Sequence, residues 1–158
     1  MARIGRAAFL LGFAGLLPQV LAVAGLMVAR WQPSDLAPGP FASVALIYAI
    51  VILSFLGGIW WGFAMRRGEG QGRLAAIAVV PSLAALALLA TLAFTGRYDW
   101  TTIAIGSAIL LTLLVDRRLV STGEAPAGWM RLRVPLSAGL GGLTILAGIL
   151  VGNPATPF

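Results

Sequence analysis

The chain has 158 residues, of which 59% are hydrophobic and only 10% are charged. Soluble domains average about 25% charged residues, so this composition excludes an ordinary soluble domain and indicates a small multi-pass membrane protein. The sequence contains no Cys and no His, which excludes thiolate chemistry, His-based acid–base catalysis and most transition-metal sites. We therefore expect no metal and no other cofactor.

Five apolar segments are long enough to cross a bilayer, because about 20 helical residues span about 30 Å of hydrocarbon. They cover residues 7–29, 41–65, 74–95, 100–115 and 134–151, and none contains Asp, Glu, Lys or Arg. The fourth segment is the shortest. The alternation typical of membrane barrel strands is absent from the sequence. The predicted fold is an all-α membrane protein in which residues 1–158 form a single bundle of five transmembrane helices.

The connections between these spans are rich in Pro, Gly and charged residues. Residues 30–40 hold three prolines and cannot continue a helix. Residues 66–72 form a short polar turn, residues 96–99 form a tight connection, and residues 116–133 are the longest predicted loop. Within the spans, Pro18 and Pro81 predict kinks. Pro135 falls in the first turn of the last span, where proline is tolerated.

The basic residues predict the orientation of the chain. All 11 are Arg, and nine of them flank the spans on the side of the N-terminus, whereas only Arg30 and Arg97 lie on the other side. The positive-inside rule then predicts an inner-membrane protein with a cytoplasmic N-terminus and a periplasmic C-terminus. Abundant Ala and Gly without Lys favour a bacterial source. Trp60, Trp61 and Trp129 are expected at the cytoplasmic interface.

The first span has a competing interpretation as a secretory signal. Arg3 and Arg6 precede an apolar stretch, and residues 22–24, Ala-Val-Ala, resemble a cleavage site. Cleavage there would leave four helices. The apolar stretch is longer than the roughly 7–15 residues of an ordinary signal core, which favours an uncleaved first helix.

Small residues recur on one face of three spans, which is typical of close helix packing in membranes. The stripes contain Gly12, Gly15 and Gln19 in the first span, Ser54, Gly58 and Gly62 in the second, and Gly141, Thr144 and Gly148 in the last. We expect these three helices to pack most closely. The alternative is chance, because the chain has 20 Gly.

Gln19 is the only amide within a span, and facing lipid its polar atoms would lack partners. We expect it to face the bundle. Its partner should be either the Ala14 carbonyl that Pro18 leaves without a donor or a hydroxyl such as that of Ser54 or Thr144.

The run Gly-Gly-Ile-Trp-Trp-Gly at residues 57–62 allows two interpretations. Gly57 and Gly58 would open a cavity walled by Trp60 and Trp61, or the run would serve helix packing and interfacial anchoring. We favour the second interpretation.

The densest group of charges falls in the predicted cytoplasmic loops. It comprises Asp116, Arg117, Arg118, Glu124, Arg131 and Arg133. Arg66 and Arg67 are predicted at the same interface. One interpretation is a site for anionic lipid headgroups or a docking protein, and the other, which we favour, is a set of solvated charges that fix orientation. Trp129, Arg131 and Arg133 are expected to hold the long loop at headgroup level on the membrane surface.

The sequence offers no catalytic residues. The five predicted spans contain no acid or base, which weighs against a proton relay, and no nucleotide-binding glycine motif is present. The Arg residues sit at the ends of apolar runs, which weighs against nucleic-acid binding. We expect a non-enzymatic protein that acts by binding lipid or a membrane-protein partner. One alternative is a passive carrier or channel for a neutral or lipid-like solute; a weaker one is an enzyme using Asp116 on a phospholipid headgroup.

Four sequence blocks resemble a known family. They are residues 11–18 (LGFAGLLP), residues 52–58 (ILSFLGG) followed by Trp61 and Gly62, residues 80–82 (VPS), and residues 126–133 (PAGWMRLR). In this order they resemble a bacterial and mitochondrial family of unknown function that includes human transmembrane protein sixty-nine. The resemblance implies a small multi-pass inner-membrane protein with an accessory or assembly role in the respiratory membrane, and it supplies no activity.

Overall fold

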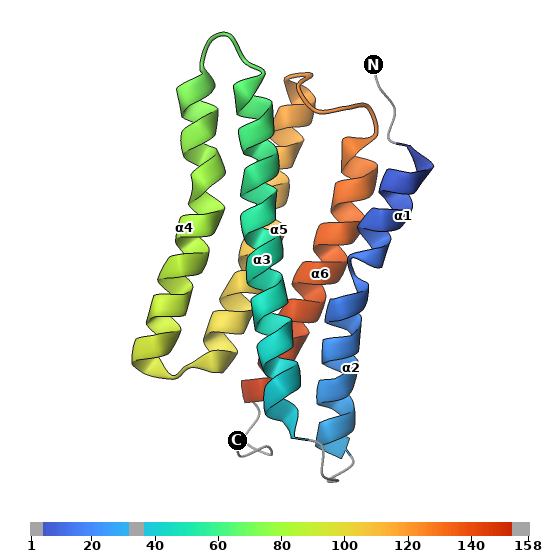
Figure 1. Cartoon of the computed structure of the whole chain (residues 1–158), viewed down its shortest axis with the longest axis vertical. Helices are drawn as coiled ribbons and strands as arrows, with labels where there is room; N and C mark the ends of the chain where they lie inside the picture. The colour runs from blue at the N-terminus through green and yellow to red at the C-terminus, as the bar shows by residue number, and fades with distance from the viewer. Residues whose placement is uncertain (1–4, 32–36, 153–158) are drawn as a thin grey trace.

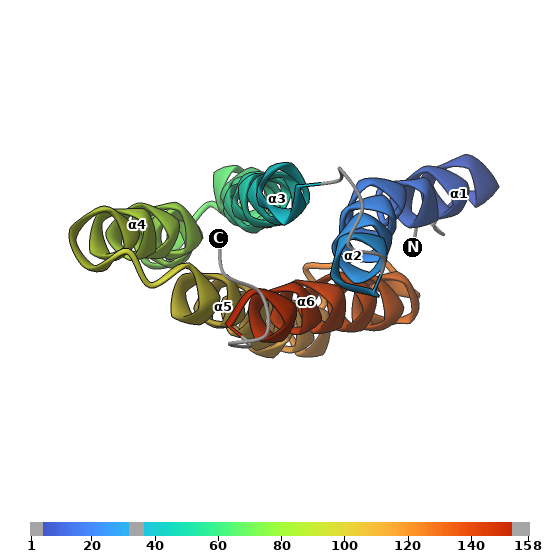
Figure 2. The ribbon, with the colours of Figure 1, turned by 90° about the horizontal axis from the view of Figure 1, so that it is seen from below.

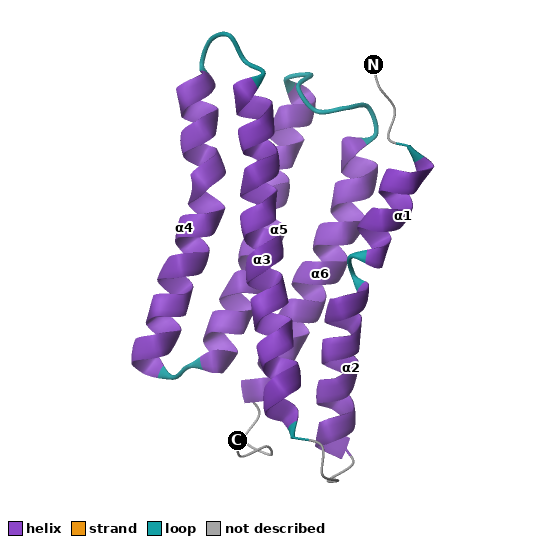
Figure 3. Cartoon of the chain, in the orientation of Figure 1, coloured by secondary structure: helices purple, strands orange, loops and turns teal. Residues whose placement is uncertain are grey.

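The computed structural model describes residues 5–31 and 37–152, and these form helices joined by short turns (Figure 3). The six helices are α1 (Arg6–Ala14), α2 (Leu17–Trp31), α3 (Pro38–Met65), α4 (Gln71–Thr95), α5 (Tyr98–Ser121) and α6 (Trp129–Gly152). The predicted all-α fold is confirmed for the described residues.

The helices form an elongated bundle (Figure 1). Helices α1 and α2 follow one another along one traverse, and α3 to α6 each make a further traverse, alternating in direction. Viewed along the bundle, α3 and α4 form one row, α5 and α6 form a second, and α2 closes one side between the rows (Figure 2). The turns after α3 and α5 lie at the end where α1 begins, and α6 ends at the opposite end.

Four helical stretches are long and apolar enough to cross a membrane. They are Arg6–Trp31, Pro38–Met65, Gln71–Thr95 and Trp129–Gly152. Helix α5 is not among them, and it carries four charged residues, Asp99, Asp116, Arg117 and Arg118. These apolar helices fit a membrane protein, while the fifth crossing stays a prediction.

The outer surface of the bundle carries many large apolar side chains, and a set of polar side chains is buried inside. Large apolar side chains that are more than half exposed include Leu21, Ile47, Val51, Leu83, Leu86, Leu111, Leu114 and Ile149. The buried polar set is Gln19, Thr101, Thr102, Thr112, Asp116, Arg133, Ser137 and Thr144. This distribution is the reverse of a soluble protein's and suits lipid as the surrounding solvent.

The prediction of a long loop over residues 116–133 is wrong. Helix α5 continues to Ser121 and α6 begins at Trp129, so only residues 122–128 connect them. Both extensions have buried faces, on which Asp116 and Arg133 pair with one another, and this pairing removes the need to hold either charge in water. Because α6 begins earlier than predicted, Pro135 lies inside it and not in its first turn.

The predicted kink at Pro18 is an interruption of the helix at residues 15 and 16 of the first span. Helix α1 ends at Ala14 and α2 begins at Leu17. Between them the Leu16 amide donates to the Phe13 carbonyl in a tighter turn. Pro18 then occupies the first turn of α2, where its missing N–H matters least. Helix α4, by contrast, continues through Pro81.

The prediction that the first, second and last spans pack most closely is wrong, because α5 and α6 share the most extensive interface. There the helix backbones meet at glycines. A Cβ placed on Gly106 would lie 2.7 Å from the Gly141 carbonyl oxygen, and one on Gly148 would lie 2.9 Å from the Asp99 carbonyl oxygen. The last stripe therefore packs against α5, and no side chain fits at these points.

The prediction that the stripe in the second span is a packing surface is also wrong. A Cβ on Gly58 or Gly62 would meet no atom within 4 Å. Gly57 is the glycine of this run that packs, since a Cβ there would meet the Ala78 carbonyl and lie 3.4 Å from Cγ of Pro81 on α4.

An ion pair fastens the turn after α3 to the connection between α5 and α6. Nε and Nη2 of Arg67 each donate to a carboxylate oxygen of Glu124 at 2.5 Å. These hydrogen bonds from Arg67 hold the pKa of Glu124 below its usual range. The pair is partly exposed, with side chains 29% and 20% accessible, so solvent screens it.

This pair predicts a small loss of stability in acid. A depressed folded pKa stabilises the fold above the unfolded value of about 4.3, and the contribution disappears as pH falls through the folded pKa. Glu124→Gln should therefore unfold more readily than wild type at pH 7, and the difference should vanish toward pH 3. Detergent-titrated unfolding at the two pH values measures it. A difference that persists unchanged in acid would contradict the assignment.

Candidate functional site

Asp116 is a fully buried acid at the centre of a polar cluster near the end of the bundle where α6 begins. Its Oδ1 accepts hydrogen bonds from Nε1 of Trp60 at 3.0 Å and of Trp129 at 3.2 Å, and its Oδ2 accepts one from Nε of Arg133 at 2.7 Å. A carboxylate is an acceptor-only group, so three N–H donors on two oxygens suit it. We call Trp60, Thr112, Asp116, Trp129 and Arg133 the Asp116 cluster.

Arg133 is the second buried charge, with 6% of its surface exposed. Its Nη2 donates to the Thr112 hydroxyl at 3.3 Å, and that hydroxyl donates to the Ile109 carbonyl at 2.6 Å. A charge in an apolar bundle is tolerated when it is paired and hydrogen-bonded. The cluster therefore joins α3, α5 and α6 through one neutral ion pair.

The structure corrects the predicted roles of these residues. Asp116 and Arg133 are not solvated loop charges, and Trp60 and Trp129 turn their indole N–H groups inward to Asp116. The remaining predicted headgroup residues, Trp61, Arg66, Arg117, Arg118 and Arg131, are exposed, and their contact with lipid stays a prediction. The signal that sequence reasoning missed is spacing, because residues 112 and 116, and residues 129 and 133, each lie one turn apart on one helix face.

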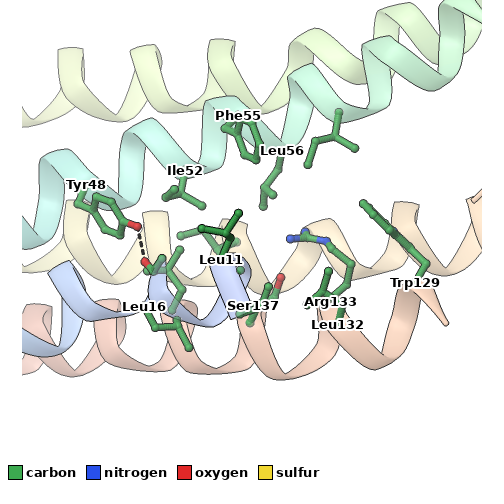
Figure 4. Close-up of a pocket in the computed structure, with 16 residues that line it drawn as sticks. Leu11, Leu16, Tyr48, Ile52, Phe55, Leu56, Trp129, Leu132, Arg133 and Ser137 are labelled. Carbon is green, nitrogen blue, oxygen red and sulfur yellow. Dashed lines mark hydrogen bonds between the residues drawn. The ribbon is translucent and has the colours of Figure 1, made fainter. Parts of the chain in front are cut away.

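A pocket of about 380 Å³ lies beside the cluster (Figure 4). We call it the side pocket. Its wall is mostly aliphatic and aromatic, and it is built from the first span, α3, α5 and α6. The lining residues are Leu11, Gly12, Gly15, Leu16, Tyr48, Ile52, Phe55, Leu56, Ile59, Ile109, Trp129, Leu132, Arg133, Leu136, Ser137 and Leu140.

The break in the first span shapes this pocket. Helix α1, which precedes the break, is directed away from α3 and packs on α6 (Figure 2). At the break, the Tyr48 hydroxyl donates to the Gly15 carbonyl and ties α3 to the first span at one end of the pocket (Figure 4). Leu11 and Phe55 are 73% and 62% exposed, so the pocket opens sideways, toward the surface that lipid would cover.

Two polar groups face the interior of the side pocket from adjacent turns of α6 (Figure 4). Ser137 is 2% exposed, and its Oγ has no hydrogen-bond partner among the described residues. The guanidinium of Arg133 binds Asp116 and Thr112 through Nε and Nη2, and within the described part of the chain Nη1 has no bonded partner. The pocket thus combines an apolar wall with unused hydrogen-bonding capacity.

Most of the residues predicted to serve helix packing, or alternatively to line a cavity, do not line this pocket. Gly12 and Gly15 do, whereas Gln19, Ser54, Gly57, Gly58, Gly62, Gly141, Thr144 and Gly148 do not. Gln19 is fully buried elsewhere, and its Nε2 donates to the Thr144 hydroxyl at 3.0 Å. The predicted hydroxyl partner is confirmed. In the described residues no group of three or more acids could hold a metal ion.

Gln19→Leu should be mild. An interhelical hydrogen bond of this kind typically contributes about 0.6 kcal/mol and at most about 1.7 kcal/mol. The Thr144 hydroxyl keeps its bond to the Leu140 carbonyl, and Gln19 Oε1 already lacks a partner among the described residues. Thermal unfolding in detergent should shift by only a few degrees, and a collapse of the fold would show that the amide holds the bundle together.

Comparison with known proteins places the chain in a family without assigning it an activity. No curated protein and no solved structure matches the chain. A family model described as "Protein of unknown function (DUF3429)" matches residues 4–150, which include the Asp116 cluster and the side pocket. The chain therefore belongs to this family of unknown function.

Proposed function

We propose that this chain is a non-enzymatic integral protein of the bacterial inner membrane that binds a lipid-like molecule in the side pocket. The observation that carries the proposal is a pocket of about 380 Å³ with a nearly continuous apolar wall and exposed Leu11 and Phe55 beside it. Ligand pockets typically occupy about 300–1,000 Å³ and are mostly apolar with a few polar groups. A molecule dissolved in the bilayer reaches such an opening without crossing water.

The Asp116 cluster supports a binding role more than a catalytic one. A general acid or base must reach the proton that it transfers. Asp116 is fully buried, and its oxygens already accept three hydrogen bonds from Trp60, Trp129 and Arg133. The cluster instead fixes the position of Arg133 at the wall of the pocket. This argument also weighs against the enzyme that uses Asp116 on a phospholipid headgroup.

The packing of the opposite half of the bundle favours binding over transport. Beyond the Tyr48–Gly15 contact, an apolar core that includes Leu46, Ala49 and Ile105 fills the interior. The fully buried Gln19–Thr144 hydrogen bond lies among these helices. A lipid-like ligand would therefore enter and leave by the same side opening. A passive carrier needs a second opening, which makes it the weaker proposal.

The five-span topology remains part of this proposal. The Arg-rich turns and the start of α1 share one end of the bundle, and α6 ends at the other (Figure 1). With Arg on the cytoplasmic side, the N-terminus is inside and the C-terminus outside. A reporter enzyme fused after Phe158 should be active only in the periplasm. Activity of the fused reporter in the cytoplasm would refute an odd number of membrane crossings.

A relationship to human transmembrane protein sixty-nine remains a prediction, which rests on the four sequence blocks that resemble its family. A respiratory accessory role has the same basis. A lipid-like ligand in the pocket is compatible with such a role and does not depend on it.

Photolabelling tests the binding proposal in membranes. A dodecane chain carrying a diazirine, added to vesicles containing the protein, should label side-pocket residues such as Ile52 and Leu136. Unlabelled dodecane should compete saturably. Ile52→Phe, which places a larger side chain in the wall of the pocket, should weaken the saturable labelling. Val51→Phe is the matched control, because Val51 is 56% exposed on the same helix and does not line the pocket. Equal, unsaturable labelling in both variants would refute the proposal.

A further inference from the structure

We propose that the occupant of the side pocket is an amphiphile whose polar end is an uncharged carbonyl group, held by Arg133 and Ser137. This inference rests on the proposed function and assigns its ligand a chemical class. The ligand would lie along the wall between α3 and α6, with its carbonyl near Arg133 and its chain running toward Tyr48 and the side opening (Figure 4).

The unused hydrogen-bonding groups determine what the polar end must be. The Ser137 hydroxyl is 2% exposed and has no partner among the described residues. Buried polar groups in proteins are nearly always hydrogen-bonded, so an unpaired one needs an explanation. Arg133 has only donors, and two of its nitrogens are occupied by Asp116 and Thr112. The ligand group that satisfies both side chains is therefore an acceptor, and a carbonyl oxygen has two lone pairs to offer.

The charge of the site excludes an anionic end. Asp116 already neutralises Arg133 at 2.7 Å, so the wall carries no net charge. In the described part of the chain no other charged side chain lines this pocket. A carboxylate or phosphate placed here would be an uncompensated charge in an apolar enclosure. A neutral carbonyl gains the hydrogen bonds without that penalty.

A ligand with no polar end is also a poorer fit. A plain hydrocarbon fills the apolar wall and leaves Ser137 and Arg133 Nη1 unpaired. Leaving a buried donor unpaired weakens binding relative to satisfying it. Two such bonds predict that a ketone competes at about thirtyfold lower concentration than an alkane of equal length, given the usual strength of a net hydrogen bond.

Competition against the dodecane diazirine probe tests the inference. The four competitors are 2-dodecanone, methyl undecanoate, dodecane and dodecanoate at pH 9, where the acid is ionised in water. The expected order of potency places the ketone and the ester ahead of dodecane, and dodecanoate last. Comparing 2-dodecanone with methyl undecanoate shows whether the site prefers a ketone carbonyl or an ester carbonyl. In Ser137→Ala, the advantage of the ketone over dodecane should shrink about fivefold. Leu140→Ala is the control, because it also removes volume from the pocket wall but no hydrogen-bonding group.

The outcomes separate this inference from the proposed function. If dodecane and the ketone compete equally in wild type, the carbonyl site is refuted and the side pocket stands. If dodecanoate competes best, the uncharged end is refuted. If no competitor reduces pocket labelling, the proposed function itself fails. A second readout is the infrared band of 2-dodecanone carrying ¹³C in its carbonyl. That band should move to lower frequency when bound to wild type and recover part of the shift in Ser137→Ala.

Discussion

Asp116→Asn should lower the free energy of unfolding by about 3–5 kcal/mol, the usual effect of removing one partner from a buried ion pair. The substitution keeps the shape of the side chain and removes its charge. Arg133, which is 6% exposed, would then be a buried cation without a counter-ion. The NH2 group of Asn would also meet only donors, because Arg133 lies on one side of the carboxylate and Trp60 and Trp129 lie on the other. SDS-titrated unfolding in mixed micelles, followed by Trp fluorescence, measures the loss.

Two variants control this experiment. Glu69→Gln makes the same chemical change at an exposed acid of the turn after α3, and it should change stability by no more than about 0.5 kcal/mol. Asp116→Asn combined with Arg133→Leu removes both charges and should recover most of the loss, because a buried pair replaced by neutral groups is often no less stable. If the double variant is as unstable as the single one, the destabilisation does not come from the unpaired Arg133.

Gly141→Leu should be nearly as damaging, because it forces α5 and α6 apart. A Cβ at this position would lie 2.9 Å from the Gly106 carbonyl oxygen and 2.9 Å from the Leu110 side chain. The backbone of Gly106 cannot move aside as the flexible end of a side chain can. We expect a loss of about 3 kcal/mol, the upper end of the range for overpacking, as a lowered unfolding temperature in detergent.

Gly142→Leu is the matched control for this substitution. It changes the neighbouring residue of the same helix, where a Cβ would meet no atom within 4 Å. We expect no loss there, and Gly58→Leu on α3 should be equally silent. Destabilisation by all three substitutions would mean that glycine flexibility, and not close packing of α5 on α6, supports the bundle.

Composition and charge predicted the class of fold but not the ends of α5 and α6. Apolar length is a strong signal for a membrane helix, and four of the predicted spans coincide with stretches that meet it. The charges at residues 116–118 indicated an interface, so the predicted helix stopped before them. Helix α5 continues because Asp116 finds Arg133 on α6, a partner that local sequence does not reveal.

Helix faces were more predictable than helix neighbours. Spacing placed Gln19 and Gly141 on inward faces correctly, because an α-helix brings residues three and four apart together. Spacing says nothing about which helix lies opposite, and Gly141 meets Gly106 on α5 where the first or second span was expected. The predicted packing role of Gly58 was wrong because small residues also occur on helix faces turned to lipid.

The side pocket had no sequence signal of its own. It depends on where the first span breaks, on the Tyr48 contact with Gly15, 33 residues away, and on the direction of α1 before the break. Pro18 predicted a distortion but not the space that it opens. Ser137 was visible as a small residue, and only its three-dimensional surroundings distinguish an unpaired hydroxyl from a packing residue.

Native mass spectrometry of the intact protein released from its own membranes tests the central claim most directly. Wild type should retain one uncharged, lipid-like adduct per chain. Val51→Phe should retain it equally, and Ile52→Phe, whose larger side chain narrows the side pocket, should retain less of it. A wild-type chain that carries no specific adduct, or an adduct that Ile52→Phe retains in full, would contradict the binding of a lipid-like ligand in this pocket.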